Sequence, residues 1–406
     1  MNVAFLVNDL QLSGGVGVVV EHARQLPRHG IEATLVLARE REDPDWRFRG
    51  LGEVEVLSLA QARERRFDVA LATWWATTEP LFELDAHRRA YFVQSLEDRF
   101  YRPDDPQRLG AAISHDLPLH VVTEARWIAE TLEELRGGRD GIRALLVRNG
   151  VAKDVFASPA ELDVRRKEPL RIVIEGNPHV WFKGVGEALA AVREMREPRH
   201  VTLVTGVRDV DTAGADEVVG PLTHEEMAAL YARSDVVLKL SRVEGMFGPP
   251  LEGFHLGATC VVTAVTGHEE YVEHGVNGLV VDWDDPRGTS RALDLLARDR
   301  ALLHRLRCGA LATARAWPSW EQAGSVMAAA LREVARRPEP AAAPAAARAI
   351  ADVRAAIEAQ ALVVAERDRL RYRVAPLERL DAIVDRAPLR WLLAPLRRLW
   401  RRVRPS

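Results

Sequence analysis

Short apolar runs alternate with longer amphipathic segments along most of the chain. In the first half the apolar runs occupy residues 2–7, 32–38, 53–59, 67–73, 89–95 and 118–123. Segments with helical spacing of apolar residues, such as EARWIAETLEEL, separate them. Buried strands that alternate with helices are typical of parallel sheets with right-handed crossovers. The pattern predicts an α/β fold with a doubly wound sheet.

The same alternation starts again after a polar, proline-bounded stretch at residues 158–169. Further apolar runs occupy residues 170–176, 200–206, 216–222, 235–240 and 259–263. The length of 406 residues is enough for two domains of ordinary size and an appendage. We predict a first Rossmann-like domain over residues 1–160 and a second over residues 161–336, which face each other across a cleft.

The remaining residues have a different composition. EPAAAPAAA lies within residues 337–347, which we interpret as a flexible or extended linker. Residues 348–406 are predicted to form a helical tail. Near-heptad apolar positions indicate a weak coiled coil, because polar residues interrupt the seam; the apolar positions are Ile350, Val353, Ile357 and Val364, and the interruptions are Gln360 and Arg367.

The end of the tail is basic and amphipathic. Apolar side chains fall on one helical face, with arginines off it; the apolar residues are Leu396, Leu399, Trp400 and Val403. This pattern predicts an anchor to an anionic membrane surface through residues 389–404. The alternative is that the basic tail docks on the acidic body. Seven arginines lie in residues 386–406, so the rest of the chain is more acidic than the net charge of −3 indicates.

Composition limits the classes of function. An acidic body argues against nucleic acid as its partner. No apolar run approaches the ~20 residues of a membrane-spanning helix, and the N-terminus lacks a basic leader. Two cysteines, Cys260 and Cys308, define no disulfide framework or zinc site. We therefore expect a cytoplasmic protein, peripheral at the inner face of the cytoplasmic membrane.

The stretch from 241 to 263, SRVEGMFGPPLEGFHLGATCVVT, holds the clearest candidate chemistry. Glu244 and Glu252 stand eight positions apart, with a glycine- and proline-rich loop between them. The apolar run before the loop predicts a buried strand, and the two prolines suit the first turn of the next helix. Strand ends and helix N-termini are where open α/β sheets bind phosphorylated ligands. The loop is therefore predicted to face a ligand, whereas the alternative is two solvated glutamates beside a turn.

These residues resemble a known family. The Glu-Gly pair at 244, the Pro-Pro-Leu-Glu segment ending at 252 and the Val-Val strand at 261 are similar to the donor-site signature of the family-4 retaining glycosyltransferases of the GT-B fold. The match continues through TGHEEYVEHGVNGLVV, residues 266–281, and extends in register from residue 1 to about residue 335. The segment YFVQSLEDRFY, 91–101, resembles bacterial rhamnan and O-polysaccharide glycosyltransferases.

The resemblance implies roles for particular residues. Glu244 would contact the transferred sugar and stabilise positive charge at its anomeric carbon, and Glu252 would hydrogen-bond the donor ribose. Lys183, in a Lys-Gly pair, would hold the donor diphosphate as charge develops on the leaving group. The backbone amides of Met246, Phe247 and Gly248 would help to hold it. The helix ending near residue 335 would cross back to the first domain.

Candidate residues of the first domain lie in two segments that follow predicted strands. Gly15 lies in a glycine-rich loop after the first strand, but the third glycine of a dinucleotide fingerprint is absent. The resemblance places Gly15 opposite the donor phosphates, and the alternative is tight-turn packing. Gln94 and Glu97 are candidate acceptor contacts, in a place where many family members have a histidine. His115 is expected to be structural.

The sequence departs from the family pattern in two places. Asn177 follows Gly176 where an arginine is common, and either His179 or Arg242 is a candidate for the second cation. Phe247 stands where the family often has glycine. The DWDD segment, 282–285, has the Asp-x-Asp spacing of metal-dependent enzymes, but it precedes a proline and a helix, so we interpret it as a helix cap and expect no catalytic metal and no cofactor.

The implied function is retaining transfer of a sugar, including a deoxyhexose such as rhamnose, from a nucleoside diphosphate sugar. The acceptor would be a surface-polysaccharide intermediate or another lipid-linked glycan. Two other hypotheses remain. A non-catalytic GT-B scaffold of a polysaccharide assembly complex fits the departures at Asn177 and at the missing histidine, and a sugar-nucleotide 2-epimerase would share the fold and the donor chemistry.

Overall fold

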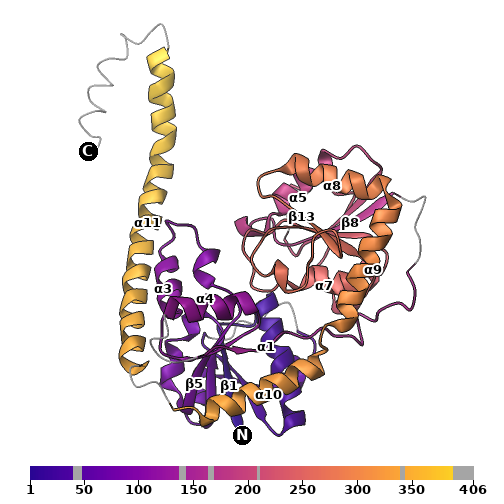
Figure 1. Cartoon of the computed structure of the whole chain (residues 1–406). Coiled ribbons are helices and arrows are strands. Elements are labelled where there is room, and N and C mark those ends of the chain that lie inside the picture. Colours follow the sequence, from indigo (N-terminus) through magenta and orange to yellow (C-terminus); the bar gives the residue numbers. More distant parts are fainter. Residues whose placement is uncertain (40–47, 137–142, 163–168, 208–210, 339–342, 387–406) are drawn as a thin grey trace.

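The protein consists of two domains built on parallel sheets, followed by a long helix (Figure 1). The structure is a computed structural model and describes residues 1–39, 48–136, 143–162, 169–207, 211–338 and 343–386. The predicted α/β class with two Rossmann-like domains is confirmed. In each sheet the first strand lies in the interior, and the order in which later strands are added reverses there. This is the doubly wound arrangement.

The first domain holds a seven-stranded parallel sheet in the order β3-β2-β1-β4-β5-β6-β7. Its strands are β1 (Asn2–Val7), β2 (Glu32–Leu37), β3 (Glu55–Ser58), β4 (Arg66–Ala72), β5 (Asp85–Val93), β6 (His120–Thr123) and β7 (Leu145–Leu146). Its α-helices are α1 (Gly14–Gln25), α2 (Leu59–Ala62), α3 (Gln107–Ser114) and α4 (Arg126–Arg136). Single turns of 3₁₀ helix are η1 (Leu26–His29), η2 (Leu51–Glu53), η3 (Trp75–Thr77), η4 (Pro80–Glu83) and η5 (Glu97–Phe100).

The second domain holds a six-stranded parallel sheet in the order β10-β9-β8-β11-β12-β13. Its strands are β8 (Leu170–Glu175), β9 (Arg199–Val204), β10 (Glu217–Val219), β11 (Val236–Lys239), β12 (Thr259–Thr263) and β13 (Gly278–Val281). Its helices are α5 (Val185–Arg193), α6 (His224–Ala232), α7 (Gly248–His255), α8 (Pro286–Arg298) and α9 (Arg300–Ala316), with 3₁₀ turns η6 (Trp181–Lys183) and η7 (His268–Glu270).

Both sheets are buried on their two faces, which explains the continuous apolar runs in the sequence. Successive side chains of a strand point to opposite faces. Phe5 and Leu6 accordingly belong to different core clusters, on the two faces of the first sheet. In the second sheet, Val237 and Leu238 likewise belong to different core clusters on its two faces. Burial on both faces removes the polar alternation that a half-exposed strand would show.

Helix α10 (Trp320–Arg336) leaves the second domain and packs on the first (Figure 1). The helical pattern breaks before it, at Trp317 and Pro318, as the sequence indicated. Its buried residues Met327 and Leu331 join the core cluster that contains Phe5. The chain thus crosses between the domains a second time.

Helix α11 (Ala343–Arg386) corrects the predicted linker. The linker was placed at residues 337–347, but α11 begins at Ala343, so the last residues of that range are helical. Alanine is the best helix former, and Pro344 is tolerated because it lies in the first turn, where its missing N–H has no partner to lose. The alanine-rich composition was therefore better evidence for a helix than for an extended segment.

The start of α11 is docked on the first domain, and the rest projects beyond the body (Figure 1). Ile350 and Ile357 are buried, and Ile350 joins the cluster that contains Leu6. Arg354 donates hydrogen bonds to Glu79 and to the carbonyl of Ala76. Two of the apolar positions assigned to a coiled-coil seam thus pack within the molecule, which overturns that interpretation for this part of the helix.

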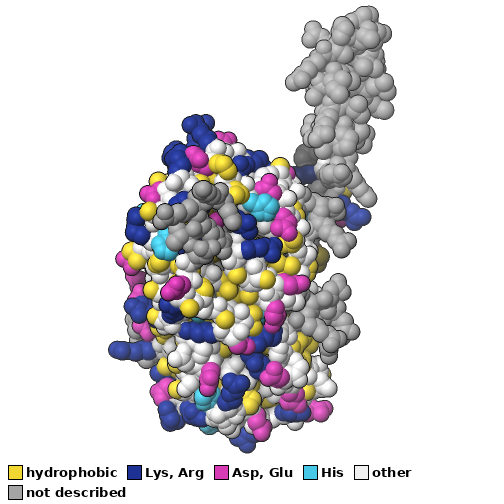
Figure 2. All heavy atoms as spheres, turned by 90° about the vertical axis from the view of Figure 1, so that its right-hand side faces the viewer, with side chains coloured by type: hydrophobic (Ala, Val, Ile, Leu, Met, Phe, Trp, Pro, Cys, Tyr) yellow, Lys and Arg dark blue, Asp and Glu magenta, His cyan; other side chains and the backbone are white. Residues whose placement is uncertain are grey.

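Within the described ranges, none of the helices is long and apolar enough to cross a bilayer. The predicted amphipathic anchor at residues 389–404 lies outside the described residues. Figure 2 shows one face of the molecule, where lysines and arginines are interspersed with acidic side chains.

Candidate functional site

The candidate site lies at the carboxyl ends of β8 and β11 in the second domain. These strands are hydrogen-bonded neighbours, and the strand order reverses between them. Open α/β sheets bind ligands at such a switch point, outside the carboxyl ends of the strands. The loop that follows β11 leads through Glu244 into α7, and η6 with Lys183 follows β8.

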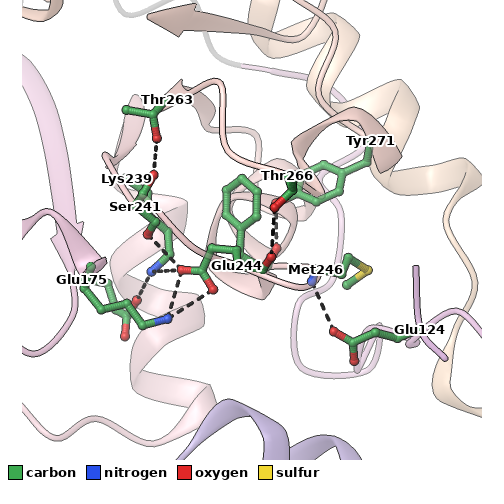
Figure 3. A network of polar contacts seen from close by, with 11 residues as sticks. Glu124, Glu175, Lys239, Ser241, Glu244, Met246, Thr263, Thr266 and Tyr271 are labelled. Atoms are coloured by element: carbon green, nitrogen blue, oxygen red, sulfur yellow. Dashed lines mark hydrogen bonds and ion pairs between the residues drawn. The ribbon is translucent and has the colours of Figure 1, made fainter. Parts of the chain in front are cut away.

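Glu244 and Lys183 form a close ion pair. Figure 3 shows the surroundings of Glu244, with Ser241 and Lys239 beside its carboxylate. The Lys183 ammonium lies 2.9 Å from Oε1 and 3.1 Å from Oε2 of Glu244, and the Ser241 hydroxyl donates to Oε1 at 2.8 Å. Glu244 is only 8% exposed. Burial by itself raises the pKa of Glu244, but Lys183, Lys239 and the hydrogen bonds outweigh burial and lower it. The carboxylate is therefore ionised at neutral pH.

Lys239 and Glu175 form a second ion pair behind the first. The Lys239 ammonium lies 2.9 Å from Oε2 of Glu175 and 3.8 Å from Oε1 of Glu244 (Figure 3). Lys239 is only 3% exposed; burial lowers its pKa, but Glu175 and Glu244 raise it by a larger amount. The sequence reasoning missed both residues, although a lysine inside the apolar run DVVLKL was the available signal.

Gly184 fixes the approach of Lys183 to the loop after β11. Gly184 has φ +64°, and a Cβ on it would overlap the carbonyl oxygen of Leu240. The amide of Arg242 donates to the carbonyl of Phe182 at 2.7 Å, so the two loops are joined beside the ion pair. The glycine of the Lys-Gly pair is thus required for both conformation and close contact.

Glu252 lies in the first turns of α7, as predicted, and the two prolines stand before it in the first turn. Burial and the nearby Glu175 raise the pKa of Glu252 to about 7, and Lys239 opposes them. Among the described residues its carboxylate accepts no hydrogen bond, and its Oε1 would lie 3.5 Å from a Cβ on Gly248. Glu252 is therefore near the loop and not committed to a protein partner.

The loop amides fit the prediction only in part. The amide of Met246 donates to Oε1 of Glu124 at 3.1 Å, so it is not available to an anion in this structure. Phe247 is buried, and its carbonyl accepts a hydrogen bond from the Tyr271 hydroxyl at 2.6 Å. The Met246 assignment is therefore corrected, whereas the roles of the Phe247 and Gly248 amides stay predictions.

Glu124 was missed, and it connects the loop to the first domain. Its other oxygen accepts a hydrogen bond from Asn149 at 2.6 Å, and burial raises the pKa of Glu124 to about 8. Asn149 belongs to the Asn-Gly segment before the second domain. A buried carboxyl group of the first domain thus holds the site loop of the second.

Gln94 and Gly15 are brought together with Gly245. A Cβ on Gly15 would lie 3.4 Å from Nε2 of Gln94, and a Cβ on Gly245 would overlap the carbonyl oxygen of Gln94. The indole N–H of Trp127 donates to the carbonyl of Gly245 at 2.8 Å. Gln94 therefore lies against the loop that carries Glu244, and Gly15 lies beside the side chain of Gln94.

Glu97 does not lie at the site as an acceptor contact would. It is 1% exposed, and its Oε2 accepts hydrogen bonds from the amide of Trp75 at 2.5 Å and from the Tyr91 hydroxyl at 2.9 Å. Its own amide donates to Nε2 of His115 at 3.1 Å. The acceptor role assigned to Glu97 is thus corrected, since its side chain is committed inside the first domain; His115 is structural, as expected.

Arg242 and the DWDD segment lie to one side of the lysine and glutamate cluster. Arg242 pairs with Asp284 and, at 3.5 Å, with Glu187, so its charge is already neutralised. Asp285 is the N-cap of α8, since its carboxylate accepts from the amide of Gly288 at 2.7 Å. The capping interpretation of the segment is confirmed.

Aromatic residues join the two domains beside Lys183. The indole N–H of Trp181, which is 38% exposed, donates to the carbonyl of Phe100 at 3.1 Å. The rings of Phe100 and Phe182 stack with centroids 5.0 Å apart, and Trp74 also stacks with Phe100, at 5.8 Å. These contacts hold η5 of the first domain against η6 of the second.

Comparison with known proteins agrees with this geometry. Residues 169–299 match the family described as Glycosyl transferases group 1. A D-inositol 3-phosphate glycosyltransferase of Xylanimonas cellulosilytica is 28% identical over 51% of this chain and 55% of its own length. The lipopolysaccharide core biosynthesis glycosyltransferase LpsE of Rhizobium meliloti is 26% identical over 60% of this chain and 70% of its own. The chain thus spans about half the length of the first of these relatives.

A solved structure resembles the chain over both domains. Alr3699/HepE from Anabaena, in complex with UDP and glucose, superposes with a TM-score of 0.64 at 16% identity, over 82% of this chain and all of that one. At this identity the likeness concerns the fold. The chain therefore has the GT-B fold, and residues 169–299 of its second domain match the Glycosyl transferases group 1 family.

Proposed function

We propose that this protein is a retaining glycosyltransferase that transfers a sugar from a nucleoside diphosphate sugar to a glycan acceptor. The observation that carries the proposal is the ion pair of Lys183 with Glu244 at the switch point of the second sheet. It joins a cation to a carboxylate where this kind of sheet binds phosphorylated ligands. The family match of the same domain and the names of the relatives support the reaction class.

The residues take complementary parts in this proposal. Lys183 binds the diphosphate and stabilises the negative charge that develops as the bond to the sugar breaks. Glu244, ionised and held by Ser241, lies beside that cation and stabilises positive charge at the anomeric carbon. Glu252, which has no protein partner among the described residues, accepts hydrogen bonds from the ribose.

We further propose that the protein's own cations replace a metal ion in this reaction. Two ammonium groups lie within 4 Å of Glu244, and ammonium groups offset the charge of a leaving diphosphate as a metal does. The acceptor in this proposal is a lipid-linked or surface polysaccharide, and the sugar includes deoxyhexoses such as rhamnose. A membrane-bound acceptor fits the basic amphipathic pattern at residues 389–404.

A nucleotide panel tests the proposal. Purified protein is titrated with UDP, GDP, ADP and dTDP and with their sugar conjugates while thermal unfolding is followed. A ligand that binds only the folded state raises the midpoint by mass action. We expect one base to give a clear shift, and we expect Lys183→Ala and Glu252→Ala to weaken binding by about 10-fold or more.

The panel also separates the alternatives. The absence of any shift would contradict the donor site and favour the non-catalytic scaffold. Conversion of a bound sugar nucleotide into its 2-epimer, without transfer to an added glycan, would favour the epimerase. Near-wild-type kcat/KM in both variants would overturn the residue roles even if transfer is observed.

A further inference from the structure

The site lacks a positive charge where the family resemblance places one. Asn177 stands in the position of the common arginine, and its Oδ1 accepts a hydrogen bond from the amide of His179 within the same turn. Arg242, one of the two candidates for the second cation, pairs with Asp284 and Glu187, so its charge is already neutralised. A nucleoside diphosphate brings at least two negative charges, so Lys183 alone does not balance it.

Lys239 of the neighbouring strand places a second ammonium group beside Glu244. Leu238 of β11 lies opposite Ile174 of β8, so the next positions, Lys239 and Glu175, meet at the carboxyl ends of the two strands. The ammonium group is almost completely buried and lies between Glu175 and Glu244. Burying a charge costs several kcal/mol in real proteins, and an apolar residue at this position would simply continue the strand.

The two partners of this ion pair differ in exposure. The side chain of Lys239 is 3% exposed, whereas that of Glu175 is 34% exposed. Glu175 therefore lies on the solvent side of the pair and covers the ammonium group. Its carboxylate also raises the pKa of Glu252, which shows that its charge is felt at the predicted ribose contact.

Charge balance indicates what happens when a diphosphate enters. Three carboxylates, Glu175, Glu244 and Glu252, surround two ammonium groups, Lys183 and Lys239. Adding a diphosphate to this set places further negative charge near Glu175, and like charges at such distances disfavour each other. An oxygen of the diphosphate and the carboxylate of Glu175 thus compete for the same cation.

We propose that Lys239 is the second cation of the diphosphate site and that Glu175 occupies it until a nucleotide binds. In this arrangement the diphosphate displaces the Glu175 carboxylate and takes its place at the ammonium group. The inference rests on the proposed donor site. It makes Lys239 a diphosphate ligand, and it makes Glu175 a competitor of the diphosphate.

Opposite effects of two substitutions test this inference. Binding of UDP is measured by calorimetry, and binding of uridine by NMR titration, with GDP and guanosine or dTDP and thymidine in parallel. We expect Lys239→Met to weaken diphosphate binding by about 10- to 100-fold. We expect Glu175→Gln to strengthen diphosphate binding by several-fold, because the competing charge is removed. Neither change should alter nucleoside binding by more than about 2-fold.

Controls separate a binding role from a structural one. Lys239→Met leaves the Glu175 carboxylate without its cation and beside an apolar group, so the double variant Lys239→Met/Glu175→Gln removes both charges and keeps the volume. We expect this double variant to fold with the wild-type circular dichroism spectrum and still bind UDP weakly. Lys153→Met, at a lysine of the first domain that donates to the carbonyl of Arg315 and lies in no ion pair within the described ranges, should bind UDP as the wild type does.

The outcomes distinguish this inference from the proposed function. If UDP, GDP and dTDP all fail to bind the wild-type protein, the donor site and this inference both fall. If one of them binds and the folded double variant binds it with wild-type affinity, the role of Lys239 is wrong and the donor site stands. Weaker binding in Glu175→Gln would overturn the exchange, because it would make Glu175 a supporting residue.

Discussion

Glu97 illustrates how burial changes the chemistry of a residue that the sequence places at a site. It was a candidate because it follows a strand and is flanked by aromatic residues. The structure places its carboxyl group inside the first domain, where burial raises its pKa to about 8. The hydrogen bonds from Trp75 and Tyr91 oppose this shift but are weaker than burial. A sequence does not show which side of a 3₁₀ turn faces the core.

The raised pKa of Glu97 makes stability depend on pH. The folded protein binds this proton more tightly than the unfolded chain, so the stabilising effect is full below about pH 4.5 and is lost as the pH rises toward 8. Glu97→Gln removes this titration. We predict that its free energy of unfolding rises relative to wild type by about 3 kcal/mol between pH 5 and 7.5.

Urea unfolding followed by tryptophan fluorescence at several pH values measures this difference. Glu130→Gln, a change at an exposed glutamate of the same domain, is the matched control and should follow the wild type at every pH. A constant difference between Glu97→Gln and wild type across this range would show that Glu97 is not protonated in the folded state.

The positions of two site residues could be predicted from local signals. Glu244 follows β11 and Glu252 lies in the first turns of α7, as the strand, the prolines and the helix implied, whereas Lys183 was named from the family resemblance alone. Lys239 and Glu175 were not foreseen, because their contact depends on which strands are neighbours. Strand order is set by packing of the whole sheet, and two strands 60 residues apart carry no local sign of their pairing.

Among the elements, the loop between β11 and α7 shows how closely the domains approach. Its strand, its prolines and its helix could all be read from the sequence, because proline position and apolar runs are local signals. Its contact with the first domain could not. Gly245 lies against the carbonyl of Gln94, and Trp127 donates to the carbonyl of Gly245.

We predict that Gly245→Ala forces the two domains apart at this loop. A Cβ at this position would overlap the carbonyl oxygen of Gln94, and backbone atoms cannot yield as a flexible side chain does. Small-angle X-ray scattering should show a larger radius of gyration, and kcat/KM for sugar transfer should fall at least 10-fold. Circular dichroism should keep the wild-type helix and strand content.

Gly186→Ala is the matched control for this change. A Cβ at Gly186 meets nothing within 4 Å, and the residue lies in α5. Replacing glycine by alanine in a helix stabilises it by about 0.5–1 kcal/mol, so this variant should keep the wild-type radius and melt slightly higher. An unchanged radius in Gly245→Ala would show that the loop adapts without moving the domains.

At the scale of the whole molecule, two late helices, α10 and the start of α11, pack back on the first domain. Two domains with separate sheets were predictable from the interrupted alternation of strands and helices. The docking of α11 was not, because Ile350 and Ile357 fit a coiled-coil seam and a docked helix face equally well. Only the apolar surface of the first domain decides between the two, and that surface is assembled from distant parts of the sequence.

Two truncations separate the roles proposed for the tail. Ending the chain after Arg386 should leave the melting temperature unchanged and abolish binding to vesicles rich in anionic lipid. Ending it after Pro338 should also lower the melting temperature, by roughly 5–10 °C, because Ile350 and Ile357 lose their burial. Calorimetry and vesicle sedimentation measure the two effects. Vesicle binding retained by the shorter chain would reject the anchor.

The projecting part of α11 has a geometric consequence for the proposed membrane-bound state. From Ile357, the last docked isoleucine, the helix continues to Arg386, which at ~1.5 Å per residue is a reach of roughly 44 Å. In the proposed membrane-bound state, such a rod would keep the body of the protein away from whatever holds the chain end. We therefore expect the protein to act on the tips of glycans that have already grown long in preference to short ones.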